Sequence, residues 1–242
     1  MAHFYLDEAL AEAVVGDRVS LRGSEARHAV TVSRIGVGET ISIGNGAGLV
    51  VSGAVVVAEH TELTIEVARA VVTARRAPAV FLAQALAKGD RDELAVQAAT
   101  ELGIDGVIPW QAGRSISRWE GAKVAKGRDR WSSVVREASK QSLRSWVPDV
   151  LDLVSTKQLL TLAKGARLLV LEPTAASTIA QFESDDRDIV LVVGPEGGIS
   201  SQELDAMAAA GASIVRLGDE VLRTSTAGPA ALAVLNVALG RW

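Results

Sequence analysis

The fold is decided by the stretch DIVLVVGPEGG, which occupies residues 188–198. Its apolar half predicts a buried strand, and its glycine-rich half predicts a turn into a helix over residues 201–210. Ser200 is followed three residues later by Glu203. Because this is the spacing of a capping box, the turn should deliver backbone N–H groups to a helix start. The stretch therefore predicts a strand, a glycine loop and a helix.

A second strand and loop follow directly. We expect the strand over residues 213–217, then the polar loop GDEVLRTSTAG over residues 218–228, and last an apolar helix over residues 229–239. Two irregular loops thus leave the ends of two successive buried strands. Open α/β sheets bind their ligands at such strand ends, so these loops are the first candidates for a binding site.

Composition limits the possible functions. The 242 residues are 48% hydrophobic, which is enough for one large domain or two small ones. The apolar runs are too short to span a membrane, and the first ten residues lack the order of a signal peptide, so we expect a cytoplasmic protein without a membrane partner. The chain has no cysteine and three scattered histidines. Thiol chemistry is excluded, and no metal site is expected.

Charge is unevenly distributed along the chain. The net charge is −4, yet residues 111–150 hold nine basic and four acidic side chains, a local excess of five positive charges. A solvated helix face explains many such runs. A surface that faces RNA phosphates is the alternative, because the excess has one sign.

The first 73 residues are predicted to form a small β-barrel domain. Short β-branched runs predict strands over residues 19–21, 39–43, 49–57 and 63–70, and a helix capped by Ser24 is expected over residues 24–33. The glycine-rich segment 44–48 lies between two strands, which indicates a hairpin loop. Barrels of this size bind RNA in many proteins, but they also serve as packing platforms.

Residues 74–242 are predicted to form a second domain, an α/β domain with a parallel sheet. The basic connector ARRAP at residues 74–78 marks the boundary. Strands and helices then alternate, which is typical of a parallel sheet covered by helices. The strands are expected at residues 80–86, 107–110, 150–153 and 167–171, and the helices at residues 90–102, 129–143, 156–163 and 175–182.

Several motifs together resemble a known family. These are LVVGPEGG at residues 191–198, LG at 217–218 and VLRTSTA at 221–227, with KGDR at 88–91, ELG at 101–103 and EASKQSLR at 137–144 upstream. They resemble the SPOUT class of methyltransferases, and within it the ribosomal RNA small subunit methyltransferase E family. The likeness covers nearly the whole chain.

The resemblance implies a fold, a cofactor and a reaction. The fold is a C-terminal parallel sheet with a deep trefoil knot, preceded by a PUA-like barrel. The cofactor is S-adenosylmethionine in the knot loops, and the reaction is methylation of N3 of one uridine in 16S rRNA, conventionally numbered 1498. Ser225 stands where many relatives carry Glu. The cofactor-binding residues implied are Leu171, Glu172, Gly194, Glu196, Gly197, Gly198, Leu217, Gly218, Leu222, Arg223, Thr224, Ser225, Thr226 and Ala227.

The resemblance also implies residues that meet RNA. Glu137, Gln141 and Arg144 would share one helical face if the helix persists to Arg144, and such a face could hold a flipped uridine. An ordinary intrahelical network is the alternative. Tryptophans interleave with the basic residues at positions 110, 119, 131 and 146, and they could stack on bases or pack in the core, with core packing favoured for Trp131. The further RNA-binding candidates are His28, Arg34, Lys88, Arg91 and Arg114.

The chemistry and the oligomeric state complete the expectation. Without cysteine, attack must come from a heteroatom, with arginine stabilising charge on the uridine carbonyl oxygens and Glu137 or solvent taking the N3 proton. The helix over residues 229–239 is apolar almost all round, so its own sheet or a second subunit must cover it. The resemblance favours a homodimer. Two other functions stay open, a ribose 2′-O-methyltransferase and a non-catalytic RNA-binding assembly factor.

Overall fold

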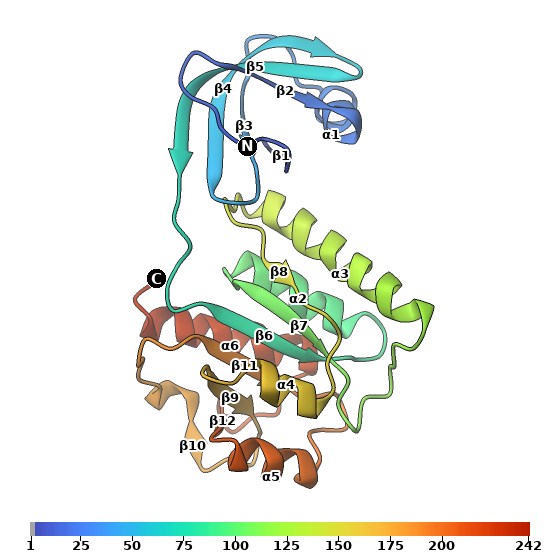
Figure 1. Ribbon diagram of the computed structural model, residues 1–242, viewed down its shortest axis with the longest axis vertical. Coiled ribbons are helices and arrows are strands. Elements are labelled where there is room, and N and C mark those ends of the chain that lie inside the picture. The colour runs from blue at the N-terminus through green and yellow to red at the C-terminus, as the bar shows by residue number, and fades with distance from the viewer. Residues whose placement is uncertain (1–2) are drawn as a thin grey trace. The chain divides into compact units, whose positions relative to one another are not determined.

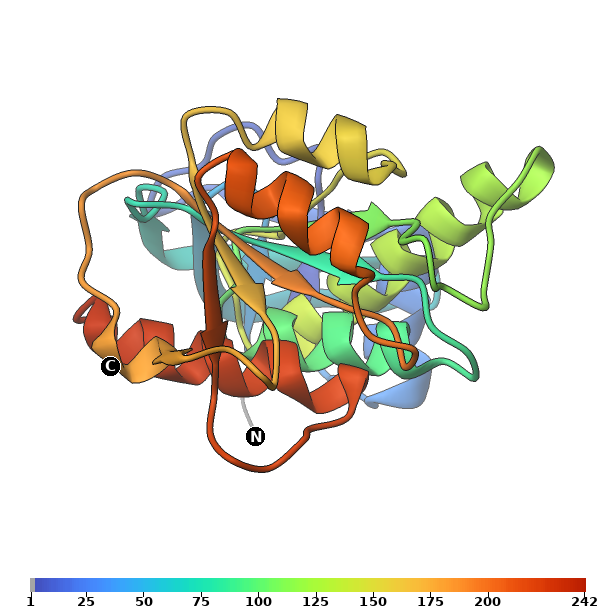
Figure 2. The same ribbon diagram turned by 90° about the horizontal axis from the view of Figure 1, so that it is seen from below.

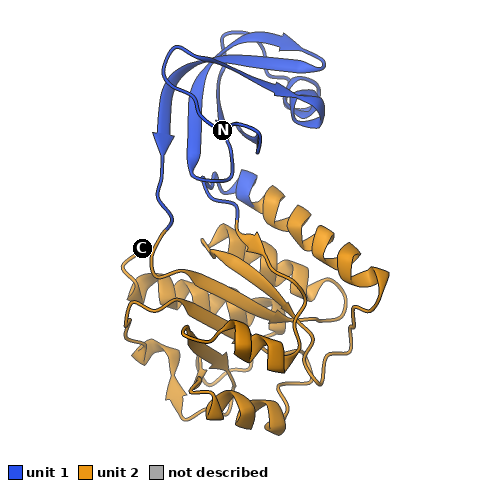
Figure 3. Cartoon of the chain, viewed as in Figure 1, with its two compact units in different colours: residues 1–75, 139–147 blue, residues 76–138, 148–242 orange. Residues whose placement is uncertain are grey.

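The computed structural model describes residues 3–242. The chain forms two compact units (Figure 3): the first runs up to Arg75 and also contains Ser139–Val147, and the second consists of Arg76–Ala138 and Pro148–Trp242. The first unit thus includes a segment from the middle of the chain, well beyond the barrel strands.

A five-stranded sheet forms the first unit, in the order β1-β3-β4-β5-β2 (Figure 1). Neighbouring strands are antiparallel, except that β1 runs parallel to β3. The segment 44–48 joins β3 to β4 as the predicted hairpin loop. Strands β2 to β5 overlap the four predicted ranges, and β1 is an additional strand. The bounds are β1 Phe4–Leu6, β2 Arg18–Arg22, β3 Thr40–Gly44, β4 Leu49–Glu59 and β5 Glu62–Val72.

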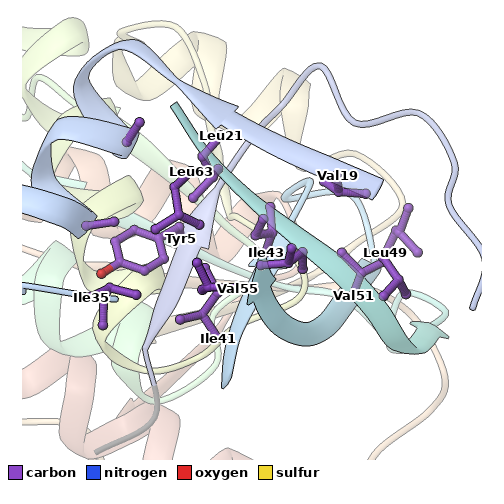
Figure 4. Packing of buried hydrophobic residues seen from close by; sticks show 14 residues of the cluster. Tyr5, Val19, Leu21, Ile35, Ile41, Ile43, Leu49, Val51, Val55 and Leu63 are labelled. Atoms are coloured by element: carbon purple, nitrogen blue, oxygen red, sulfur yellow. The ribbon is translucent and has the colours of Figure 1, made fainter. Parts of the chain in front are cut away.

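The core of the first unit follows from the two-residue period of its strands. In β3, Ile41 and Ile43 point inward and are almost fully buried, whereas Ser42 between them hydrogen-bonds to Ser52 of β4 at 2.8 Å. Figure 4 shows side chains of the neighbouring strands and of Tyr5 gathered around these isoleucines. One face of the curved sheet therefore encloses the apolar side chains.

A short helical segment follows β2, but Ser24 does not cap it. Helix α1, Gly23–Arg27, begins one residue earlier than expected and continues as one π-helical turn, η1, His28–Val32. Gly23 has a φ of +64°, which lets the chain turn from the strand straight into the helix. Arg22 therefore takes the N-cap position, and Ser24 lies inside the helix.

Polar contacts bind the segment 139–147 to α1, to the residue before β4 and to the residue after β5. The Lys140 ammonium lies 3.1 Å from a Glu25 carboxylate oxygen, and these side chains are only 6% and 13% exposed. The backbone N–H of Gly48 donates to the Ser145 carbonyl at 2.9 Å. The Trp146 indole N–H donates to the Thr73 carbonyl at 2.7 Å. This segment is thus part of the first unit.

The second unit contains a seven-stranded parallel sheet in the order β10-β12-β9-β11-β6-β7-β8. Strand β11 lies at the centre, between β9 and β6, and all five of its residues are buried. The parallel sheet is the one predicted. Its strands are β6 Val80–Ala85, β7 Gly106–Trp110, β8 Asp149–Val150, β9 Arg167–Leu171, β10 Ser177–Thr178, β11 Ile189–Val193 and β12 Ser213–Arg216.

Helices cover both faces of this sheet. Figure 2 shows α4 and α5 on one face and α2 with α6 on the other. Ser200 caps α5 through the predicted capping box with Glu203. The helices are α2 Arg91–Glu101, α3 Ala122–Gln141, α4 Thr156–Leu162, α5 Ser201–Ala209 and α6 Thr224–Ala238.

The C-terminal helix is threaded through an earlier loop. Residues 172–188 connect β9 to β11, and within them the 3₁₀ turn η2, Ile179–Gln181, contacts α6. Helix α6 also packs against α2 and β11. It therefore lies between this connection and the sheet, as Figure 2 shows. The chain end passes through a loop made earlier in the sequence, which is the topology of a trefoil knot.

Two helices begin earlier than predicted. The predicted start lay just after a glycine that the structure places inside the helix. Helix α3 begins at Ala122 rather than residue 129, and α6 begins at Thr224 rather than residue 229. A Cβ on Gly127 would lie 2.4 Å from the Trp119 ring, and one on Gly228 would lie 3.1 Å from Leu82. Each glycine permits a close contact on its helix, although glycine normally indicates a boundary.

The predicted helix over residues 175–182 is wrong. Residues 177 and 178 form β10, which pairs in parallel with Val215 and Arg216 of β12, and only the turn η2 follows. The sequence AASTIAQF is compatible with a helix. Pairing with a distant strand overrides this local preference.

Candidate active site

A pocket of about 340 Å³ opens where three neighbouring strands end. The strands β9, β11 and β12 are adjacent in the sheet, and each passes into an irregular loop at its C-terminal end. The three loops and the start of α6 surround the pocket. Its lining is Arg91, Leu171, Glu172, Pro173, Val193, Gly194, Pro195, Glu196, Gly198, Ile199, Arg216, Leu217, Gly218, Glu220, Val221, Leu222, Arg223, Thr224 and Ala227.

Most of the expected cofactor residues meet in this pocket. Leu171, Glu172, Gly194, Glu196, Gly198, Leu217, Gly218, Leu222, Arg223, Thr224 and Ala227 all line it. Three others lie outside the lining. Gly197 faces the Arg114 segment instead, with its Cβ position 3.4 Å from the Arg114 Cβ and carbonyl oxygen. Ser225 and Thr226 belong to the first turn of α6.

A buried amide that none of the sequence motifs singled out holds the start of α6 in place. Gln84 of β6 is fully buried, and its Nε2 donates to the Thr224 hydroxyl at 2.8 Å. The Thr224 hydroxyl donates to the Gly194 carbonyl at 2.8 Å. Both Thr224 and Gly194 line the pocket. This relay therefore ties the glycine loop to the start of α6.

Glu196 is held at the pocket edge by two donors from one segment. Its Oε1 accepts from the Lys88 backbone N–H at 3.1 Å and from the Arg91 guanidinium at 2.9 Å. Partial burial opposes ionisation of this carboxyl. Hydrogen bonds from its own N–H, from Lys88 and from Arg91 outweigh burial and lower the pKa of Glu196 below its ordinary value. Lys88 and Arg91, both expected to meet RNA, thus adjoin the cofactor loop.

Another part of the pocket wall is the loop after β9. Glu172 is half-buried, and its Oε1 accepts from the Thr174 hydroxyl at 3.0 Å. Arg216 of β12 donates to the carbonyls of Ala175 and Ala176 at 2.7 and 3.2 Å. Arg216 was not selected from the sequence. Its guanidinium fastens this wall to the neighbouring strand.

Arg114 contacts the glycine loop from outside the pocket. Its Nη1 donates to the Gly197 carbonyl at 3.2 Å, while much of its side chain is exposed. An exposed guanidinium beside a pocket can meet a phosphate or a base edge.

Comparison with known proteins identifies the family. The family model described as RNA methyltransferase domain matches residues 75–236, and the one described as RNA methyltransferase PUA domain matches residues 21–68. Ribosomal RNA small subunit methyltransferase E of Mycobacterium tuberculosis is 42% identical over 226 residues, covering 91% of this chain and 86% of that protein. The chain belongs to the ribosomal RNA small subunit methyltransferase E family.

Further relatives of the family agree in sequence and in fold. The Bacillus subtilis protein of the same name is 31% identical and covers 90% of this chain and 89% of its own length. The crystal structure of the Neisseria gonorrhoeae protein of the same name, bound to S-adenosyl methionine, superposes on this chain with a TM-score of 0.88. The two sequences are 28% identical, and the match covers 98% of each chain. The SPOUT fold preceded by a PUA domain is thereby confirmed.

Glu137, Gln141 and Arg144 do not share one helical face in this methyltransferase, so that prediction is wrong. Helix α3 ends at Gln141, and Leu143 has a φ of +57°, so Arg144 does not continue the helical face. The Arg144 backbone N–H instead donates to the Ser139 carbonyl at 2.9 Å. Glu137 is exposed and lies 3.4 Å from the Arg136 guanidinium. Gln141 and Arg144 belong to the first unit, and Glu137 belongs to the second.

Much of the basic excess in residues 111–150 is neutralised by ion pairs. Arg128 pairs with Asp152 at 2.7 Å, and Arg130 pairs with Glu93 at 2.5 Å. Lys140 pairs with Glu25, as described above. The basic side chains of this segment that lie exposed without a carboxylate partner among residues 3–242 are Arg114, Arg118, Lys123 and Lys126.

The four tryptophans within residues 110–146 pack against other residues of the protein. Trp110 and Trp131 are almost fully buried, which confirms core packing for Trp131. Trp119 meets Trp131 edge to face, with ring centroids 5.4 Å apart. Trp146 lies 4.5 Å below the Arg75 guanidinium. The rings are therefore engaged by protein neighbours.

The remaining RNA candidates lie in the first unit. His28 meets Tyr5 edge to face, and Arg34 is exposed in a left-handed turn after η1. Within residues 3–242 no group of three or more His, Asp or Glu side chains is arranged to hold a metal ion. No helix in that range is long and apolar enough to cross a bilayer.

Proposed function

We propose that the protein transfers a methyl group from S-adenosylmethionine to N3 of one uridine in 16S rRNA, conventionally numbered 1498, in the small ribosomal subunit in the cytoplasm. The observation that carries the proposal is the pocket at the ends of β9, β11 and β12 in a member of this family. Two related structures, from Neisseria gonorrhoeae and Legionella pneumophila, contain bound S-adenosylmethionine.

The pocket fits such a cofactor. Its volume lies within the range of roughly 300–1,000 Å³ that is usual for small-molecule sites. Leu171, Val193 and Leu222 offer apolar contacts for a flat base. Glu172 and Glu196 offer carboxylates for hydroxyl or ammonium groups. When bound, S-adenosylmethionine supplies an electrophilic methyl group on a sulfonium.

Residues outside the pocket would hold and activate the uridine. As N3 loses its proton, negative charge spreads to the two carbonyl oxygens beside it. The Arg144 guanidinium would stabilise this charge without titrating. Gln141 can donate to one edge atom and accept from another. Glu137 or solvent would take the proton. The transfer is then governed mainly by positioning.

Methylation of purified small subunits tests the reaction. Subunits from a strain that lacks the modification are incubated with the protein and labelled S-adenosylmethionine, and the modified nucleotide is mapped by mass spectrometry. A methyl group on N3 of the uracil base is expected. A methyl group on ribose would instead favour the 2′-O-methyltransferase. If calorimetry found no binding of S-adenosylmethionine, the chain would be an assembly factor without this activity.

Arg144→Ala tests the uridine site. We expect turnover to fall about 100-fold or more, while the Kd for S-adenosylmethionine changes less than about threefold. Arg144→Lys should restore little, because an ammonium cannot reproduce a two-pronged contact. Equal losses in turnover and cofactor affinity would instead assign Arg144 to the cofactor pocket.

A further inference from the structure

The capping carboxylate of α5 makes more contacts than a helix cap requires. Glu203 is 9% exposed, and four donors reach its two oxygens. Oε2 accepts from the Ser200 backbone N–H at 3.2 Å and from the Ser200 hydroxyl at 2.7 Å, which completes the cap. Oε1 accepts from the Gly113 backbone N–H at 2.8 Å and from the Thr156 hydroxyl at 2.7 Å. The second oxygen thus binds two other parts of the chain.

A second capping box shows what capping alone needs. At the start of α4, Gln158 accepts from the backbone N–H and the hydroxyl of Ser155 through one amide oxygen, at 2.9 and 2.7 Å. Gln158 is exposed, and no charge is involved. A glutamine therefore suffices for this motif. The buried charge of Glu203 and its contacts through Oε1 require a different explanation.

Those contacts lead to Arg114. Gly113 approaches the carboxylate so closely that a Cβ at this position would lie 3.2 Å from Oε2 of Glu203. The next residue, Arg114, donates to the Gly197 carbonyl at 3.2 Å and packs against Gly197. One anion therefore connects the turn that carries Arg114 with the helix that follows the glycine loop.

We propose that Glu203 is a positioning residue, which holds Arg114 in register with the glycine loop of the cofactor pocket. This inference rests on the proposed function, since it deepens the role of Arg114 toward RNA. The carboxylate touches neither substrate nor cofactor in this proposal. It fixes the backbone of Gly113, and the guanidinium of Arg114 is thereby presented beside the pocket.

The Glu203→Gln variant should remove the positioning of Gly113 and Arg114 selectively. If the amide oxygen keeps the cap, as in Gln158, the NH₂ group faces the Gly113 N–H, and two donors cannot bond to each other. Thr156 can rotate its hydroxyl, but a backbone N–H cannot turn away. Ser200→Ala is the matched variant, because it weakens the same cap while leaving the Gly113 bond intact. Asp205→Asn, an exposed change on the same helix, is the control.

Kinetics and binding separate positioning from general destabilisation. For Glu203→Gln we expect kcat/KM for the small subunit to fall about tenfold, with the Kd for S-adenosylmethionine changed by less than about threefold. Adding Glu203→Gln to Arg114→Ala should cost less than about a further twofold, because the two residues act as one unit. Ser200→Ala, compared at equal distance below its Tm, and Asp205→Asn should keep kcat/KM.

Amide hydrogen exchange provides a readout that does not depend on activity. The Gly113 amide should exchange at least about tenfold faster in Glu203→Gln than in wild type or Ser200→Ala. Unchanged exchange at Gly113, or losses that multiply in the double variant, would overturn the positioning role. If wild-type protein methylated no RNA, the proposed function would fail, and the exchange result would still decide whether Glu203 holds this turn.

Discussion

Two adjacent glycines of the pocket loop serve different physical purposes. At Gly197 a side chain would meet Arg114 at 3.4 Å, so the requirement there is close approach. At Gly198 the space within 4 Å is open among the described residues, but φ is +71°. Residues with a Cβ rarely adopt this conformation. The second glycine is thus required by the backbone.

Gly198→Val should therefore weaken cofactor binding by distorting the loop. A β-branched residue at this φ costs about 1–3 kcal/mol of strain, which the loop can relieve only by moving. Gly211→Val is the matched control, because Gly211 has a φ of +86° and open space but lies outside the pocket. Both variants should lose thermal stability. Calorimetry should find weaker binding of S-adenosylmethionine only for Gly198→Val, and normal affinity there would contradict the loop assignment.

The ionised form of Glu196 should contribute to stability in a defined pH range. Its folded-state pKa is lowered below the ordinary 4.5. The contribution is therefore complete above about pH 4.5 and is lost as the pH falls through the lowered pKa. Denaturant unfolding at several pH values should show that the stability difference between wild type and Glu196→Gln shrinks in acid. Arg91→Met should give an intermediate curve, because the backbone donors remain. A difference that grows in acid would refute this.

At the scale of elements, glycines inside helices decide how helices pack. Gly127 lies in the third helix, α3, where the Trp119 ring covers it, and Gly228 lies in α6 against Leu82 and Val193. In both helices the glycine lowers the local helix propensity but permits a close contact with a neighbouring side chain. The early start of α6 also brings Thr224 to the pocket, where it joins the Gln84 relay.

Gly127→Ala should destabilise the protein although alanine favours helices. The propensity gain is about 1 kcal/mol, but the new methyl group would lie 2.4 Å from a rigid indole, and such overpacking costs about 1–3 kcal/mol or more. A lower Tm is expected. In a Trp119→Ala background the same change should become stabilising, because the space is then free. Stabilisation in the wild-type background would show that Trp119 moves aside at little cost.

For the whole molecule, the candidate residues are divided between two units. The pocket and Glu137 belong to the second unit, whereas Gln141 and Arg144 belong to the first. We propose that the first unit and the exposed basic side chains bind rRNA phosphates while the knot holds the cofactor.

We also propose a homodimer. Helix α6 packs on α2 and β11, yet Val237 and Trp242 at the C-terminal end of the chain remain 64% and 62% exposed.

Sedimentation and complementation test the homodimer. The protein should sediment at about twice the 25.3 kDa chain mass down to sub-micromolar concentration, as a large apolar interface implies. If each active site uses residues of both subunits, mixing Gly198→Val with Arg144→Ala should restore part of the activity, because some mixed dimers contain one intact site. A fully active monomer at assay concentration would exclude this arrangement.

Local patterns in the sequence determined much of this protein. The buried strands β9 and β11 follow from short apolar runs bounded by turn residues, and the Ser200–Glu203 capping box follows from a spacing of three. The glycine loops could be selected as a candidate binding site, because ligands of open α/β sheets bind at strand ends. These features depend on residues close in sequence, so propensity and periodicity are enough to find them.

The features that depend on residues distant in sequence appear only in the folded chain. Trp119 and Leu82 determine that Gly127 and Gly228 lie inside helices, and β12 makes a strand of residues 177–178. Gln84 contacts Thr224, which is 140 residues away in sequence, and Glu203 contacts Gly113, which is 90 residues away. The threading of α6 likewise leaves no local pattern. Contacts of this range outweigh the small differences in local propensity, which is why the sequence alone could not reveal them.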